Sequence, residues 1–459
     1  MTREELVQYA VEYTSFYAEK YAGANLQDGK SLPILTKEEA AHAGVSIISR
    51  EYYTKLGTPE VKSAYTSGST GISLEAFSTN AESAGQLFSL WLYRRKYYGI
   101  NTDAKFCFFF TLRDHYGQTK YDEQKNYLGI SKELLQREKL DEIFGRIYAF
   151  QPKWLLLQPS IAMILARYIY ETGAEVPGSL TYIELSGEMV TDRQRRFIES
   201  AFDAVTASQY GCNEIGSIAY ECPEGNLHVM DHNVYVEIEP FTEQERAAGT
   251  GHVIVTARHN KVMPFIRYDT GDIAGWKDVS CTCGCHGAVL ELTGARKDDM
   301  IRLQDGQRIS ANLFRRVIQA VECCMEGRIY QYQVRQTTVD TFEIFMATDG
   351  EPEEIEGLFC EFIRDSLVGE AAFLFRYYEQ LLPDELTGKL KFFLVHDTGA
   401  DRGCRKRCRS ITQTSHNSNS NNHIWLIMSA INMIFCSPQA KLFCRQRAKI
   451  IAAGCRVFA

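Results

Sequence analysis

The chain has 459 residues, of which 45% are hydrophobic and 24% charged. This balance is typical of a soluble globular protein, and the length is too great for a single core. The net charge is −8, but residues 399–459 carry ten Lys or Arg and one Asp, so residues 1–398 have a net charge of −17. Such an acidic body argues against nucleic acid as the main partner.

The N-terminus begins with the pattern of an amphipathic helix rather than with an apolar segment. We therefore expect no secretory signal, no membrane span and a cytoplasmic location. In that compartment the fourteen cysteines are expected to stay reduced or to bind metal. Residues 1–60 read as helices and loops, with Thr36 as a helix N-cap.

A glycine-rich run follows a short strand-like segment. Its polar and glycine residues are Thr66, Ser67, Gly68, Ser69, Thr70 and Gly71. Free N–H groups and hydroxyls in such a run can bind phosphate. The run is not a Walker A loop, because the Gly-Lys-Ser/Thr ending is missing. An ordinary surface turn is the alternative.

The next part alternates between strands and helices. Strands are expected at 105–110, 154–158, 182–185 and 205–210, and helices at 80–98, 161–171 and 192–202. This order predicts an α/β fold, with a sheet flanked by helices and ligand groups at the strand C-termini. Short strands between residues 234 and 265 predict a β-rich subdomain.

A second, smaller α/β pattern occupies residues 300–396. We therefore expect a large N-terminal domain (1–297), a small mobile C-terminal domain (298–398) and a basic tail (399–459). The tail contains five cysteines and an apolar stretch of twelve residues, too short to span a bilayer as a helix. We interpret it as disordered or extraneous. A membrane-surface or partner-binding tail is the alternative.

Five further short segments follow the glycine-rich run in a fixed order. They are Ser186–Glu188, Tyr210–Gly216, Arg267–Asp272, Gly294–Ile301 and Thr387–Lys391. As an ordered set, the six segments resemble the adenylate-forming (acyl-CoA synthetase-like) superfamily. Its phenylacetate–CoA ligase and coenzyme F390 synthetase-related branch is the most similar part, over roughly residues 10–395.

The resemblance implies roles for single residues. Gly187 and Glu188 would lie along the adenine, with Tyr210 and Gly211 beside it, and Asp272 would accept hydrogen bonds from both ribose hydroxyls. Tyr210 could instead be core packing, and Asp272 a turn aspartate that bonds its own backbone.

Three more residues would act on the reacting groups. Glu214 could hold Mg²⁺, which prefers oxygen ligands, or could simply be an acid at a helix N-terminus. Arg296 matches the arginine before the interdomain hinge, whose pivot would be Asp298 or Asp299. Lys389 matches the lysine that reaches the substrate carboxylate and the α-phosphate. Alone, Gly388-Lys389 would read as a solvated turn.

The resemblance implies two half-reactions. ATP and a carboxylic acid first give an acyl adenylate and pyrophosphate. The small domain then rotates, and a thiol of coenzyme A or of a carrier-protein phosphopantetheine takes the acyl group. Two positions depart from the family pattern, Ile72-Ser73 in the glycine-rich run and Cys212-Asn213 before Glu214. We interpret both as variation within this branch.

The branch suggests an aromatic acid, for which Phe108, Phe110, His115 and Tyr116 could line the pocket. An F390-type adenylyltransferase that forms no thioester is one alternative. A nucleotide-binding relative without turnover is another. The oligomeric state stays open, with a homodimer as one candidate.

Two cysteine-containing clusters predict a structural zinc site. The expected ligands are Cys222, His228, Cys281 and Cys283, with Cys285 or His286 as substitutes. Four soft or imidazole ligands from two short clusters are typical of structural zinc. Reduced, partly buried cysteines without a metal are the alternative.

Overall fold

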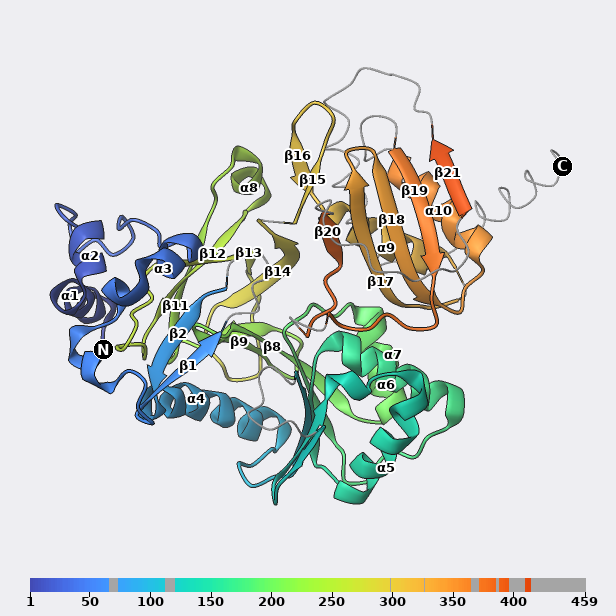
Figure 1. The fold of residues 1–459 in the computed structure, drawn as a ribbon, viewed down its shortest axis with the longest axis horizontal. Coiled ribbons are helices and arrows are strands. Elements are labelled where there is room, and N and C mark those ends of the chain that lie inside the picture. Colours follow the sequence, from blue (N-terminus) through green and yellow to red (C-terminus); the bar gives the residue numbers. More distant parts are fainter. Residues whose placement is uncertain are drawn as a thin grey trace. The chain divides into compact units, whose positions relative to one another are not determined.

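The computed structural model describes residues 1–65, 73–111, 120–297, 299–325, 327–364, 371–384, 388–395 and 409–413 (Figure 1). The chain divides into two compact units. Unit 1 comprises residues 1–298 together with the segment 382–390, and unit 2 comprises residues 299–381 and 391–459. Each unit is described by itself.

Unit 1 is built on one sheet of twelve strands, in the order β11-β12-β13-β14-β10-β9-β8-β7-β6-β3-β5-β4. Their bounds are β3 Phe106–Phe110, β4 Tyr121–Glu123, β5 Tyr127–Ser131, β6 Trp154–Leu157, β7 Tyr182–Ser186, β8 Val205–Cys212, β9 Gly216–Glu221, β10 Leu227–Val229, β11 Val234–Glu239, β12 Thr250–Ala257, β13 Tyr268–Lys277 and β14 Val289–Arg296. A separate hairpin pairs β1 (Val61–Tyr65) with β2 (Glu75–Thr79).

The sheet has a parallel part and an antiparallel part. Strands β5, β3, β6, β7 and β8 are parallel neighbours. This confirms the predicted α/β fold, since β3, β6, β7 and β8 correspond to the four expected strands, whereas β5 was not predicted. From β8 onward the pairing is antiparallel. The β-rich segment therefore continues the same sheet instead of forming its own.

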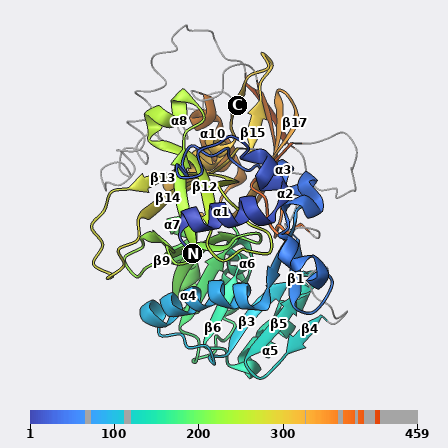
Figure 2. The same cartoon turned by 90° about the vertical axis from the view of Figure 1, so that its left-hand side faces the viewer.

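Helices cover both faces of the parallel part. The helices of unit 1 are α1 Arg3–Tyr13, α2 Ser15–Lys20, α3 Lys37–Ala43, α4 Asn80–Tyr98, α5 Leu140–Phe150, α6 Pro159–Thr172, α7 Asp192–Phe202 and α8 Glu243–Ala248. Figures 1 and 2 show α4 on one face of these strands and α5, α6 and α7 on the other. Trp91 of α4 packs edge-on against Trp154 of β6, at 5.9 Å between ring centroids.

Helix α3 begins where the sequence predicts. Thr36 is its N-cap, and Glu39 completes a capping box. The preceding residue, Leu35, is bound to the start of β13. Its N–H donates to the carbonyl of Arg267 and its carbonyl accepts from the N–H of Asp269, both at 2.9 Å. This pairing holds Lys37, the first residue of α3, close to the start of β13.

Unit 2 is a small α/β domain. Its sheet has the order β20-β17-β18-β19-β21, and a hairpin of two further strands precedes it. The bounds are β15 Met300–Arg302, β16 Arg308–Ser310, α9 Asn312–Cys324, β17 Ile329–Thr338, β18 Thr341–Thr348, α10 Pro352–Arg364, β19 Ala371–Tyr377, β20 Phe393–Val395 and β21 Arg409–Gln413. Its core packs both helices against β17, β18 and β19 through residues such as Phe314, Phe342 and Phe359.

Candidate active site

Asp272 lies between two partners that the sequence also singles out. The Tyr210 hydroxyl donates to Asp272 Oδ2 at 2.9 Å, and Arg296 Nε lies 3.0 Å from Asp272 Oδ1. Asp272 on β13 and Arg296 on β14 are direct cross-strand neighbours. Burial, with the Asp272 charge adding to it, raises the pKa of Tyr210 well above its usual value. Tyr210 therefore stays a neutral donor that orients the carboxylate.

Glu214 follows β8 and is held on both its side chain and its backbone. The Tyr268 hydroxyl donates to Glu214 Oε1 at 2.7 Å, and Asn260 Nδ2 donates to the Glu214 carbonyl at 3.1 Å. The residue is only 8% exposed. A buried carboxylate costs free energy unless cations or donors compensate it, so Glu214 is a suitable ligand for a hard cation.

Lys37 supplies a cation that the sequence reading missed. Its charge interacts with the carboxylate of Glu214 and with the guanidinium of Arg296, and burial lowers its pKa. Sequence reasoning noted this stretch only as a helix start. The deciding contact, between Leu35 and β13, is long-range and has no local signature.

The glycine-rich residues 66–71 lie outside the described residues, but the two strands that flank them, β1 and β2, are described. Tyr65 and Glu75 are the last paired residues of the β1–β2 hairpin. Asn213 Nδ2 donates to the Tyr65 carbonyl at 2.9 Å. Tyr65, the last described residue before the run, is therefore bonded to the residue that precedes Glu214.

Gly211 has a structural reason to be glycine. It lies in β8 opposite β9, where the pairing shifts register between Tyr210 and Gly211. An added Cβ would lie 2.3 Å from the carbonyl oxygen of Gly216. No real side chain tolerates that distance, so the close approach of β8 and β9 requires a glycine here.

The end of β7 joins this group from the other side. Ser186 Oγ donates to Gln209 Oε1 at 2.6 Å, which links β7 to the residue before Tyr210. Next come Gly187 and Glu188, and an added Cβ at Gly187 would lie 3.7 Å from Lys389 Cε. The segment 382–390, which carries Lys389, thus lies at the same edge of the sheet as Tyr210.

Glu188 accepts three hydrogen bonds from two distant parts of the chain. Its carboxylate accepts hydrogen bonds from the Ser160 N–H (2.9 Å), the Ser160 hydroxyl (3.0 Å) and the Leu390 N–H (3.0 Å). Burial raises its pKa, while these donors and the charge of Lys389 act in the opposite direction. This side chain therefore connects the start of α6 to the residue after Lys389.

The candidate aromatic residues are only partly described. Phe108 and Phe110 on β3 lie on one face of the strand, with ring centroids 6.2 Å apart. Both rings lie close to Gly129 on β5. His115 and Tyr116 lie outside the described residues, as does Asp298.

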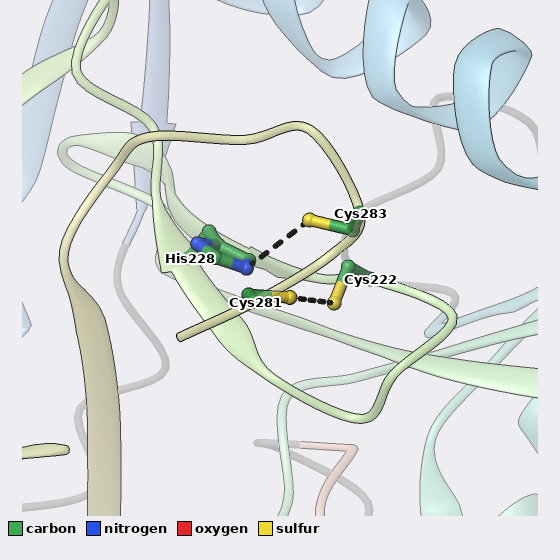
Figure 3. A group of neighbouring side chains, drawn as sticks. All are labelled: Cys222, His228, Cys281 and Cys283. Carbon is green, nitrogen blue, oxygen red and sulfur yellow. Dashed lines mark hydrogen bonds between the residues drawn. The ribbon is translucent and has the colours of Figure 1, made fainter. Parts of the chain in front are cut away.

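A separate cluster gathers the four predicted zinc ligands. One ligand atom each of Cys222, His228, Cys281 and Cys283 lies within 4.8 Å of the others. Cys222 Sγ and Cys281 Sγ are 3.6 Å apart, and Cys283 Sγ is 3.4 Å from His228 Nε2 (Figure 3). Cys285 Sγ instead lies 3.7 Å from the Tyr93 hydroxyl.

The comparisons with known proteins give two relatives by sequence. The chain is 27% identical over 209 residues to the phenylacetate-coenzyme A ligase of Thermus thermophilus, over 43% of this chain and 46% of the relative. It is 26% identical over 291 residues to the protein CapK of Staphylococcus aureus, over 59% and 60%. The chain thus spans about half to three fifths of these curated relatives. No protein-family model matches it.

The fold has well-matched solved structures. One is the crystal structure of 2-hydroxyisobutyryl-CoA ligase in the postadenylation state, in complex with R3-HIB-AMP. It aligns with a TM-score of 0.66 and 15% identity, over 86% of this chain and 88% of that chain. Within the described residues, no helix combines the length and apolar character needed to cross a membrane. The chain is therefore similar in sequence to part of a phenylacetate-coenzyme A ligase and shares the fold of 2-hydroxyisobutyryl-CoA ligase.

Proposed function

We propose that this chain joins a carboxylic acid to AMP from ATP and then transfers the acyl group to the thiol of coenzyme A. One observation carries the proposal. Asp272 of β13 contacts both Tyr210 and Arg296, Glu214 follows β8 and is bound by Tyr268 of β13, and Lys389 lies beside Gly187 after β7. Adenylation brings a carboxylate and a triphosphate together, so it requires fixed cations and donors at one edge.

The residues divide between recognition and charge compensation. Asp272, oriented by Tyr210 and Arg296, offers carboxylate oxygens to the ribose hydroxyls. Lys37 and Arg296 place positive charge near Glu214, where the phosphates would lie. Lys389 is suited to approach the carboxylate and the α-phosphate, because an ammonium on a flexible stem is a compact charge.

The side chain of Glu214 has the chemistry that a magnesium ligand requires. Glu214 is a buried carboxylate, and Mg²⁺ prefers oxygen ligands. When bound, the ion would reduce the negative charge of the triphosphate. The residues of the chain then orient the acid and the α-phosphate around it.

The test measures pyrophosphate release across a panel of carboxylic acids, followed by thioester formation with added coenzyme A. Arylacetic and benzoic acids come first, because Phe108 and Phe110 supply aromatic surface near β5. Release without any thioester would favour the AMP-transferring alternative or a carrier-protein acceptor. No release with any acid would leave a nucleotide-binding protein without turnover.

Replacing Glu214 with glutamine should lower adenylation by on the order of a hundredfold and shift half-saturation to higher Mg²⁺. The amide keeps the shape and the bond from Tyr268, but it is a much weaker ligand. Pyrophosphate release measured against Mg²⁺ concentration checks this. Glu243→Gln, at an exposed position of α8, is the matched control. An unchanged Mg²⁺ dependence would exclude Glu214 as the ligand.

Replacing Lys37 with methionine should raise the KM for ATP about tenfold and change kcat less. The variant removes one charge near the phosphates while keeping the length of the stem. Steady-state kinetics with ATP as the varied substrate checks this. Lys30→Met, at an exposed site, should behave like the wild type. Equal ATP affinity in the two variants would contradict a phosphate role for Lys37.

We also propose that the Cys222–His228–Cys281–Cys283 cluster holds a structural zinc ion. Zinc bonds of about 2.3 Å to sulfur and 2.0 Å to nitrogen give tetrahedral separations of roughly 3.8 Å (S···S) and 3.5 Å (S···N). The separations of 3.6 Å and 3.4 Å fit these values. His228 Nδ1 lies 2.8 Å from the Gly287 carbonyl, which leaves Nε2 as the ligand atom.

A further inference from the structure

The backbone around Lys389 is held on two sides by charged side chains from distant parts of unit 1. On one side, Lys132 Nζ donates to the Gly388 carbonyl at 2.9 Å. On the other side, Glu188 Oε1 accepts the Leu390 N–H at 3.0 Å. Lys132 follows β5 and Glu188 follows β7, so the two contacts come from two strands of the parallel part.

The Glu188 side chain and the bound segment are each held by further hydrogen bonds. Glu188 is oriented by two donors of Ser160, its N–H and its hydroxyl, at the start of α6. The segment is folded back on itself, because the Gly388 N–H donates to the Asp384 carbonyl at 2.7 Å and the Asp384 N–H donates to the Lys389 carbonyl at 3.1 Å. Asp384 and Gly388–Leu390, joined by these two hydrogen bonds, form the Lys389 turn, and both residues that flank Lys389 are bound by other parts of unit 1.

Gly388 shows how closely the turn fits. Its φ of +62° is in the left-handed region, which favours glycine. An added Cβ would lie 2.5 Å from both Lys132 Nζ and Thr111 Cγ2. A side chain here would push against the Lys132 ammonium that binds the Gly388 carbonyl and against Thr111, so both the left-handed φ and the close contacts favour glycine before Lys389.

From these contacts we infer that Lys132 and Glu188 are positioning residues that hold the Gly388–Leu390 backbone so that the Lys389 ammonium points at the reacting groups. The inference rests on the proposed function, because Lys389 acts there in adenylation. Neither residue needs to touch the substrate. Each contributes a hydrogen bond between a charged group and the backbone. Loss of such a bond typically shifts the equilibrium between the held and the released backbone by on the order of tenfold to a hundredfold.

The first experiment measures hydrogen exchange and needs no turnover. In Glu188→Ala and Lys132→Met, peptides covering residues 382–395 should exchange about tenfold faster than in the wild type, because the turn loses an anchor. Lys139→Met, at an exposed position after the same strand, is the matched control and should exchange like the wild type. Unchanged exchange in both variants overturns the inference.

The second experiment separates the half-reactions. Pyrophosphate release should fall ten- to hundredfold in Lys132→Met and in Gly388→Ala, and Lys132→Arg should recover most of it. Thioester formation from a supplied acyl adenylate and coenzyme A should fall much less, because the bond between the acyl group and AMP is already present in the supplied adenylate. An equal loss in both half-reactions, or no recovery with arginine, indicates a general structural role and overturns the inference.

The two experiments also separate this inference from the proposed function. A wild-type protein that releases no pyrophosphate with any acid contradicts the function, whereas the exchange measurement still decides whether Lys132 and Glu188 hold the turn. Normal wild-type turnover with unchanged exchange and kinetics in the variants contradicts the positioning role alone.

Discussion

Replacing Lys389 with alanine should lower pyrophosphate release by about 10²–10³-fold, the typical loss when one fixed electrostatic donor is removed. The residue lies beside Gly187 at the end of β7, where a Cβ on that glycine would be 3.7 Å from Lys389 Cε. Its charge also acts on the buried carboxylate of Glu188. In the proposed reaction, an ammonium at this edge of the sheet would compensate the charge that develops as the carboxylate attacks the α-phosphate.

The measurement follows pyrophosphate in a single turnover with saturating ATP and acid. Lys125→Ala, in the exposed loop between β4 and β5, controls for loss of a lysine and should match the wild type. Thioester formation from a supplied acyl adenylate should fall far less than adenylation in Lys389→Ala. A variant that releases pyrophosphate within threefold of the wild type would show that Lys389 has no part in adenylation.

Local signals explain why much of the fold could be predicted. Helices α4 and α7 begin where the pattern indicates, because each has an N-terminal capping box whose two partners are three residues apart, Thr79 with Glu82 and Thr191 with Gln194. The parallel strands are apolar runs between helices, a pattern that is visible without any long-range information.

Long-range pairing explains what could not be predicted. Nothing in the sequence near Lys37 points to Glu214, because the two meet only through the pairing of Leu35 with β13. Lys132 likewise reads as a surface lysine until the 382–390 segment is in place. Conversely, Glu188 was predicted to lie along the adenine, whereas its observed hydrogen bonds run to Ser160 and Leu390. Its role toward the nucleotide stays a prediction.

The Cys/His cluster gives the second large expected effect. Purified protein should contain about one equivalent of zinc, and Cys281→Ser should remove most of it and lower the stability of unit 1 by about 3–5 kcal/mol. For a domain of this size that corresponds to a fall in Tm of roughly 6–15 °C. The reason lies in the placement of the ligands, since Cys222 and His228 flank the turn from β9 to β10 while Cys281 and Cys283 lie in the loop from β13 to β14.

A zinc ion bound here would join two connections that are far apart in sequence, and its loss would free each connection from the other. Elemental analysis and thermal unfolding of the same samples check this. Cys285→Ser is the matched control, because it changes a thiol of the same loop that lies 3.7 Å from the Tyr93 hydroxyl, outside the four-ligand cluster. It should keep its zinc and most of its Tm. Two results together would show that the thiols are reduced cysteines without a metal. The wild type would contain less than half an equivalent of zinc, and Cys281→Ser and Cys285→Ser would both unfold at the Tm of the wild type.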